Sequence, residues 1–183
     1  KAFPDPLKDV SEEQFYGAIN YVEPSLIRVE ADEVTYGLHI CLRFEMEQGL
    51  FDGSIKVKDL PAIWNEKMKN YFGLTPPNDA QGVLQDIHWA HGSFGYFPTY
   101  LKGTLFSAQW WNALQKDVPN RDALIAKGDF APIKQWLNQK IHREGRRFWA
   151  NDLAKHVTGE ALNPTHFITY LKEKFGPVYG IGL

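Results

Sequence analysis

The sequence has one cysteine, no long apolar run and no excess of basic residues. Cys41 alone cannot form a disulfide within the chain. No uninterrupted apolar segment approaches the roughly 18 residues that a membrane span needs. Lys and Arg number 20 against 22 Asp and Glu, so the chain lacks the basic surface typical of proteins that bind nucleic acid or anionic membranes. We therefore expect no nucleic-acid partner, no membrane partner and a cytoplasmic protein.

The composition is that of an ordinary globular protein. The chain has 183 residues, of which 44% are hydrophobic and 23% are charged, and these values predict a single domain over residues 1–183. Aromatic residues are frequent at 14%. The first residue is Lys1 rather than Met, so we expect the true N-terminus to lie upstream.

The pattern of apolar residues and helix-ending residues predicts an all-α fold, because no segment alternates as a strand does. Ser11 and Gln14 have the spacing of a capping box at the start of a helix that ends near Asn20. A longer helix is predicted from about residue 25 to 50, where Asp52-Gly53 ends it, and its apolar residues occupy most of the circumference. The fold is thus predicted as an irregular array of helices around this long buried helix, without significant sheet; the other expected helices cover residues 60–72, 98–116, 120–127, 131–143, 151–157 and 164–175.

Polar residues form one stripe along the predicted helix over residues 25–50. They are spaced by three or four, as the positions on one face of a helix are: Arg28, Asp32, Thr35, His39 and Arg43. Two interpretations remain open. The stripe is either an internal network, with an Arg28 to Asp32 ion pair and His39 as a core histidine, or the wall of a polar cleft that faces a ligand.

The segment from Gly82 to Tyr100 is the strongest candidate for a functional site. It places histidines, tyrosines, Gln85 and Asp86 among large apolar residues and glycines, which is typical of a partly dry ligand pocket. His88 is a candidate hydrogen-bond donor, and either Tyr96 or Tyr100 is a candidate phenol donor to a developing oxyanion. The alternative for the tyrosines is a core position with a satisfied hydroxyl group.

A complete metal site or nucleophile triad is not predicted within the chain. His88 and His91 are three residues apart with Asp86 nearby, but Gly92 and Gly95 disfavour the helix that this spacing requires. The sequence has no His-Glu-x-x-His pair and no cysteine cluster. Ser93 does not lie in a Gly-x-Ser-x-Gly turn. The remaining groups, with Arg28 for a carboxylate, form half of an active site.

Two motifs resemble signatures of the carboxypeptidase Taq family of thermostable zinc metallocarboxypeptidases. Residues 27–32 have the form Ile-Arg-x-x-Ala-Asp, and residues 82–89 have the form Gly-x-x-Gln-Asp-x-His-Trp. The resemblance covers the whole chain. It implies a largely helical protein that removes single residues from the C-termini of peptide substrates, as an intracellular homodimer.

The resemblance also implies roles for individual residues. Arg28 is expected to receive the terminal carboxylate of the substrate, with Asp32 holding the guanidinium in place. His88 and Tyr96 or Tyr100 are expected to face the oxyanion. Gln85 and Asp86 are included in the substrate-binding set and are expected to orient His88 or its loop.

The chain departs from the family in one respect. The His-Glu-x-x-His helix and the later Glu, which hold zinc (or cobalt) and supply the general base in the family, are absent from these residues. We therefore expect the C-terminal part of such an enzyme, with the metal ligands outside this chain, and a fragment that is inactive alone. Self-association through exposed apolar surface is also expected. The alternative function is an all-helical protein-interaction module without catalysis.

Overall fold

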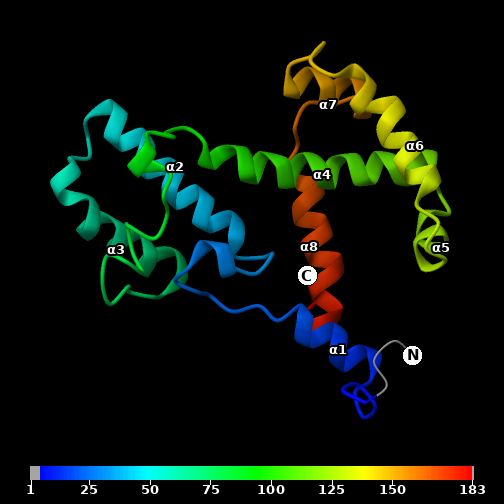
Figure 1. Ribbon diagram of the computed structural model, residues 1–183, viewed down its shortest axis with the longest axis horizontal. Helices are drawn as coiled ribbons and strands as arrows, with labels where there is room; N and C mark the ends of the chain where they lie inside the picture. The colour runs from blue at the N-terminus through cyan, green and yellow to red at the C-terminus, as the bar shows by residue number, and fades with distance from the viewer. Residues whose placement is uncertain (1–4, 183) are drawn as a thin grey trace. The chain divides into compact units, whose positions relative to one another are not determined.

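The computed structural model describes residues 5–182, and the elements along the chain are drawn in Figure 1. Within this range there are eight α-helices and four short 3-10 turns, and no strand is present. The all-α prediction is therefore confirmed. The residues group into two compact units, one ending at Leu101 and the other beginning at Lys102. The single domain expected over residues 1–183 remains a prediction.

The unit that ends at Leu101 is built around a pair of helices and a loop. Its elements are α1 (Glu12–Ile19), η1 (Arg28–Glu30), α2 (Tyr36–Asp52), η2 (Val57–Asp59), α3 (Leu60–Phe72), η3 (Trp89–His91) and the first residues of α4 (Phe97–Asp117). Its buried core contains side chains from α2, from α3 and from the loop that precedes α4: Leu42, Met46, Trp64, Met68, Phe72 and Val83. This core fixes the loop that carries the second sequence motif.

The capping box predicted at Ser11 is present. The Ser11 hydroxyl accepts a hydrogen bond from the Gln14 backbone N–H at 3.1 Å, and the Ser11 backbone N–H donates to the Gln14 side chain at 2.9 Å. The two bonds satisfy backbone donors that the first turn of a helix leaves free. The local signal therefore determined where α1 begins.

The long helix predicted from about residue 25 begins later, at Tyr36, so that boundary was wrong. The cause is the Asp32 carboxylate, which accepts hydrogen bonds from the backbone N–H groups of Val34 and Thr35 at 2.9 Å each and from the Thr35 hydroxyl at 2.8 Å. Such local bonds compete with a continuous helix and favour a turn at its start. The end of α2 is as predicted, with Gly53 in the left-handed conformation at φ 82°.

The unit that begins at Lys102 has its own core. It contains the rest of α4 and four further helices with one 3-10 turn: α5 (Arg121–Ala126), α6 (Ala131–Lys140), η4 (His142–Glu144), α7 (Ala150–Thr158) and α8 (Thr165–Tyr179). Leu114, Trp136 and Ile141 form the buried cluster. Helix α8 passes the predicted end at residue 175, because Pro177 is accommodated inside it and Gly180 ends it at φ 63°.

One buried amide connects α4 to the segment that precedes α8. Gln109 is 1% exposed, and its side-chain nitrogen donates to the Thr158 hydroxyl and to the Ala161 carbonyl at 3.0 Å each. Its side-chain oxygen accepts the Asn163 backbone N–H at 3.0 Å. These bonds satisfy backbone groups that a loop would otherwise have to expose to water.

We predict that Gln109→Ala destabilises the protein by about 1–3 kcal/mol, because it leaves buried backbone groups unpaired. The measurement is the free energy of unfolding in urea. The matched control is Gln139→Ala on α6, an exposed position where we expect a change within about 0.5 kcal/mol. Equal effects of the two substitutions would contradict the structural role of Gln109.

Candidate functional site

The Arg28 side chain is buried and already paired. It lies on η1, is 7% exposed, and donates from Nε and Nη2 to Asp86 Oδ1 at 3.1 and 2.7 Å. Its Nη1 donates to the Tyr36 hydroxyl at 3.3 Å. A guanidinium has five N–H groups, and three of them are used by these bonds. Two N–H groups of Arg28 therefore remain for another acceptor.

A second arginine shares the same carboxylate. Arg43 on α2 is completely buried and donates from Nε to Asp86 Oδ2 at 2.7 Å and from Nη1 to the His39 carbonyl at 2.8 Å. The Asp86 carboxylate thus lies between two guanidinium groups, one on each oxygen. Such an arrangement compensates the charges where a single buried charge would be costly.

Burial and charge act in opposite directions on this cluster. Burial alone raises the pKa of Asp86, but the hydrogen bonds and charges of Arg28 and Arg43 outweigh it and hold the pKa below its usual value. Burial lowers the pKa of Arg43 to about 10, although Asp86 opposes this shift. For Arg28, Asp86 outweighs the effect of burial, and the pKa is raised. All three groups are therefore ionised at neutral pH.

Gln85 fastens the loop before α4 to the segment that carries Arg28. Its side-chain oxygen accepts the Arg28 backbone N–H at 2.9 Å and Arg43 Nη2 at 2.8 Å. Its side-chain nitrogen donates to the Leu26 carbonyl at 3.0 Å. The predicted orienting role of Gln85 and Asp86 is thus consistent with their contacts, which are to protein groups.

His88 lies on a platform of aromatic rings at the start of α4. Its Nε2 is 3.1 Å from the Tyr100 hydroxyl, and its ring centroid is 4.4 Å from that of Phe97 and 5.9 Å from that of Tyr96. Nδ1 lies 3.9 Å from Asp86 Oδ1, which is too long for a hydrogen bond. Burial lowers the pKa of His88, and the nearby Asp86 carboxylate only partly opposes this shift. The imidazole is therefore neutral at pH 7.

The two candidate tyrosines differ in exposure and in contacts. Tyr96 is 50% exposed, and its ring meets that of Tyr100 edge to face at 5.4 Å. Tyr100 bonds to His88, and the Arg28 guanidinium lies 5.3 Å from the centre of its ring. Arg28, His88, Tyr96 and Tyr100 therefore gather in one place. This is the convergence that the half-site interpretation requires.

Glycines set the path of the loop between these residues. Gly92 and Gly95 have φ values of 79° and 76°, in the left-handed region where a side chain is disfavoured. The first ends η3, and the second precedes Tyr96. Together they turn the chain so that His88 and Tyr100 face one another although they are 12 residues apart.

The internal interpretation of the polar stripe is half right. The expected ion pair between Arg28 and Asp32 is wrong, because the carboxylate paired with Arg28 is that of Asp86. The cause is the turn at residue 32, where the Asp32 carboxylate binds backbone N–H groups, including that of Glu23 at 3.1 Å. His39 is a core histidine, fully buried and stacked on Phe72 at 4.3 Å, and burial lowers its pKa to about 4.

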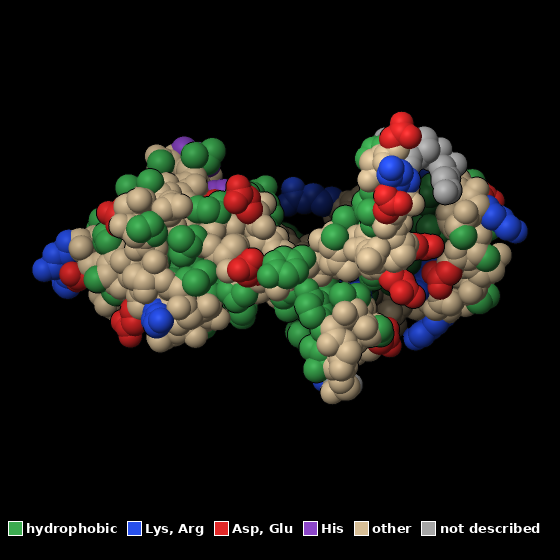
Figure 2. All heavy atoms as spheres, turned by 90° about the horizontal axis from the view of Figure 1, so that it is seen from below, with side chains coloured by type: hydrophobic (Ala, Val, Ile, Leu, Met, Phe, Trp, Pro, Cys, Tyr) green, Lys and Arg blue, Asp and Glu red, His purple; other side chains and the backbone are tan. Residues whose placement is uncertain are grey.

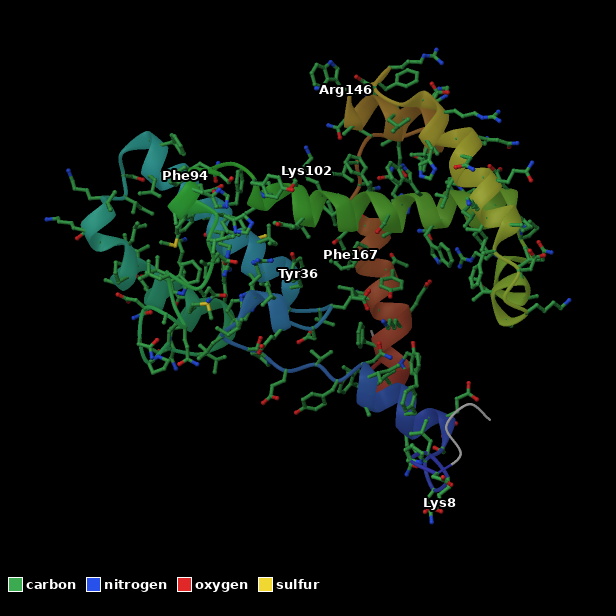
Figure 3. The ribbon with its side chains drawn as sticks, viewed as in Figure 1. Lys8, Tyr36, Phe94, Lys102, Arg146 and Phe167 are labelled. Carbon is green, nitrogen blue, oxygen red and sulfur yellow. The ribbon has the colours of Figure 1, made fainter. Side chains whose placement is uncertain are left out.

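Three residues of the site were given no role by the sequence. Arg43 belongs to the predicted stripe, and its regular spacing from His39 was the available signal. Tyr36, labelled in Figure 3, supports the Arg28 guanidinium, and no pattern in the sequence marked it. Phe97 lies under His88 and within 5.7 Å of both guanidinium groups. Its position depends on how α4 begins.

The possibility of a metal site at His88, His91 and Asp86 finds no support within residues 5–182. No group of three or more His, Cys, Asp or Glu side chains in this range is arranged to hold an ion. The rings of His88 and His91 are 6.2 Å apart, and His91 Nδ1 bonds to the Ser93 hydroxyl at 2.9 Å. The described residues therefore do not fit a metal centre. Separately, none of the described helices is long and apolar enough to cross a membrane.

An apolar pocket lies on the other side of Trp89. Its volume is about 430 Å³, and it is lined by Leu50, Phe51, Val57, Leu60, Trp89 and Phe94. Phe51 and Val57 are each 74% exposed. Figure 2 shows apolar side chains at the surface of the face that it displays. Exposed apolar surface of this kind is typical of a surface that another protein segment covers.

The comparisons with known proteins agree on one family. The family model described as carboxypeptidase Taq (M32) metallopeptidase matches residues 1–175. Carboxypeptidase 1 of Bacillus subtilis is 48% identical over 179 residues, which are 98% of this chain and 36% of that protein. Thermostable carboxypeptidase 1 of Thermus thermophilus is 47% identical over 174 residues, which are 95% and 34% of the two chains. The crystal structure of the M32 carboxypeptidase from Deinococcus radiodurans R1 matches with a TM-score of 0.94 and 39% identity, over 98% of this chain and 36% of that one. The chain spans about a third of the length of these relatives.

We predict that Asp86→Asn destabilises the protein by about 3–5 kcal/mol at pH 7, because it leaves two buried guanidinium groups without their counter-charge. The pKa of Asp86 is lowered in the folded state, so its stabilising effect is present above the unfolded pKa of about 4 and is lost as the pH falls through the folded value. The difference in unfolding free energy between parent and variant should narrow over that range.

Urea unfolding at a series of pH values measures this difference. Asp79→Asn, at an exposed position in the loop before Gly82, is the control and should show no such narrowing. A difference between parent and Asp86→Asn that stays constant with pH would contradict the ionised cluster.

Proposed function

Because the chain belongs to the carboxypeptidase Taq (M32) metallopeptidase family, we propose that it is the C-terminal part of a metal-dependent carboxypeptidase, which hydrolyses the C-terminal peptide bond of its substrate. The observation that carries this proposal is the meeting of the two sequence motifs. Arg28 from the first motif bonds at 2.7 Å to Asp86 from the second, two residues before His88. Substrate-binding and oxyanion-binding groups are thereby brought to one site.

Arg28 is proposed to bind the terminal carboxylate of the peptide. Its two remaining N–H groups can donate to a carboxylate, which is the acceptor that a guanidinium recognises best. Asp86 and Tyr36 hold the group from the protein side. Asp32 contributes indirectly, because its bonds shape the turn between Arg28 and α2.

His88 and the two tyrosines are proposed to stabilise the oxyanion. In the bond between His88 Nε2 and the Tyr100 hydroxyl, one partner donates. Tyr100 can donate to substrate only when the histidine Nε2–H donates to the phenol oxygen, so the tautomer of His88 decides whether Tyr100 is available. Tyr96, which is more exposed, is the second candidate donor. Removing one preorganised donor of this kind costs roughly 3 kcal/mol of transition-state stabilisation.

The metal of the proposed enzyme belongs to residues outside this chain. We propose zinc or cobalt, which when bound polarises the scissile carbonyl and activates water. The residues described here do not fit such a site, so their part is confined to binding and orienting the substrate. The chain alone is accordingly proposed to be inactive, and the intact protein to act on peptides in the cytoplasm as a homodimer.

An all-helical interaction module without catalysis is the second candidate. It is favoured by the apolar pocket beside Trp89, whose walls include two strongly exposed side chains. In that case the Arg28 cluster serves only to hold the loop in place. Kinetics of variants at Arg28 distinguish the two functions.

We predict that Arg28→Lys lowers kcat/KM for C-terminal hydrolysis by roughly a hundredfold, since a lysine keeps the charge but loses the bidentate contact with the substrate carboxylate. The assay follows release of free amino acid by the full polypeptide that carries this chain, with a divalent metal added. Binding of a peptide and of its C-terminal amide is measured in parallel. The parent should favour the carboxylate, and the variant should discriminate much less.

Arg121→Lys is the matched control, since Arg121 is a half-buried guanidinium over an aromatic ring in the other unit. It should leave kcat/KM unchanged. Unaltered discrimination between carboxylate and amide in Arg28→Lys would refute the proposed role of Arg28.

We also predict that the isolated 183-residue chain self-associates, because apolar residues such as Phe51 and Val57 are strongly exposed. Light scattering over a range of concentrations measures this. Phe51→Ser should reduce the association more than Phe44→Ser, on the same helix but outside the apolar pocket. A monodisperse monomer at every concentration would rule the prediction out.

A further inference from the structure

Glu47 is a buried carboxylate with one clear partner. It lies on α2, is 3% exposed, and its Oε1 accepts the indole N–H of Trp89 at 2.9 Å. Oε2 is buried and has no hydrogen-bond partner among the described residues. A carboxylate in such a place is costly, so a neutral side chain would be expected if packing were its only purpose.

The position of Glu47 on α2 suggests that purpose. Glu47 follows Arg43 by four residues, so the two side chains share one face of the helix. Arg43 binds Asp86, two residues before His88, and Glu47 binds Trp89, the residue after it. The backbone on both sides of His88 is thus attached to successive turns of α2.

The ring of Trp89 carries this attachment to the histidine. It stacks on Phe94 at 6.2 Å and meets Trp64 and Phe97 edge to face at 6.3 and 6.0 Å. The Phe97 ring is also the one that supports the His88 imidazole. A movement of Trp89 therefore displaces His88 both through the backbone and through Phe97.

We propose that Glu47 is a positioning residue, which by holding the Trp89 indole against α2 fixes His88 at its place beside the Tyr100 hydroxyl. The contribution to catalysis rests on the function proposed above, whereas the mechanical role does not. The negative charge matters because an N–H bond to a carboxylate is stronger than one to a neutral acceptor. An amide at position 47 should preserve the attachment in part.

The test compares Glu47→Leu, which removes the acceptor, with Glu47→Gln, which keeps one, and with Trp89→Phe, which removes the donor but keeps an aromatic ring. The matched control is Trp136→Phe. It breaks an equivalent bond, from the Trp136 indole to Asp117 Oδ2 at 2.7 Å, in the unit that begins at Lys102.

Two measurements are made on the full polypeptide that carries this chain. The first is the titration of His88 by NMR with labelled histidine, assigned with His88→Gln. Burial lowers the pKa of His88, with Arg28, His91 and Arg43 acting in the same direction and Asp86 against it. A histidine that is released toward solvent should titrate closer to its ordinary value. The second measurement is kcat/KM for C-terminal hydrolysis.

In Glu47→Leu and Trp89→Phe we expect the pKa of His88 to rise and kcat/KM to fall by about 10- to 100-fold, as small displacements of reacting groups do. Glu47→Gln should lie nearer the parent in both measurements. Trp136→Phe should change neither, even if it lowers the melting temperature.

An unchanged His88 titration in both Glu47→Leu and Trp89→Phe would overturn the proposal. An equal loss of kcat/KM in Trp136→Phe would also overturn it, by showing that the effect is one of general stability. If the parent has no carboxypeptidase activity, the proposed function fails, while the NMR comparison still tests the attachment of His88.

Discussion

The Asp86 carboxylate between two guanidinium groups is the interaction on which the rest of the site depends. Each of its oxygens binds a different arginine, at 2.7 Å to Arg28 and 2.6 Å to Arg43. The three charges are buried together, so removing one leaves the others uncompensated. The cluster therefore locks three segments into one geometry: the turn before α2, α2 itself and the loop before α4.

This constraint explains why a loop rich in glycine can hold functional groups precisely. Gly92 and Gly95 provide the turns, but they do not fix where the side chains point. Direction comes from bonds to α2 on either side of His88 and from the aromatic rings beneath it. A rigid helix thus supports residues on a loop, which is a common way to build a binding site.

The proposed division of labour follows from which charges are already satisfied. Asp86 and Arg43 are consumed by internal bonds, and Asp32 is occupied by backbone N–H groups. Arg28 keeps two N–H groups, and Tyr96 is half exposed. These are the groups left to meet a substrate.

The sequence by itself determined the features that depend on neighbours in the chain. The capping box at Ser11, the end of α2 at Gly53, the all-helical class and the two family motifs were all readable, because each rests on a few adjacent residues. Only the tertiary structure decided which carboxylate pairs with Arg28. A continuous helix would have placed Asp32 beside it, whereas the turn at Asp32 leaves room for Asp86, 58 residues away. Long-range pairing of buried charges depends on how helices and loops pack, and spacing along the sequence does not encode it.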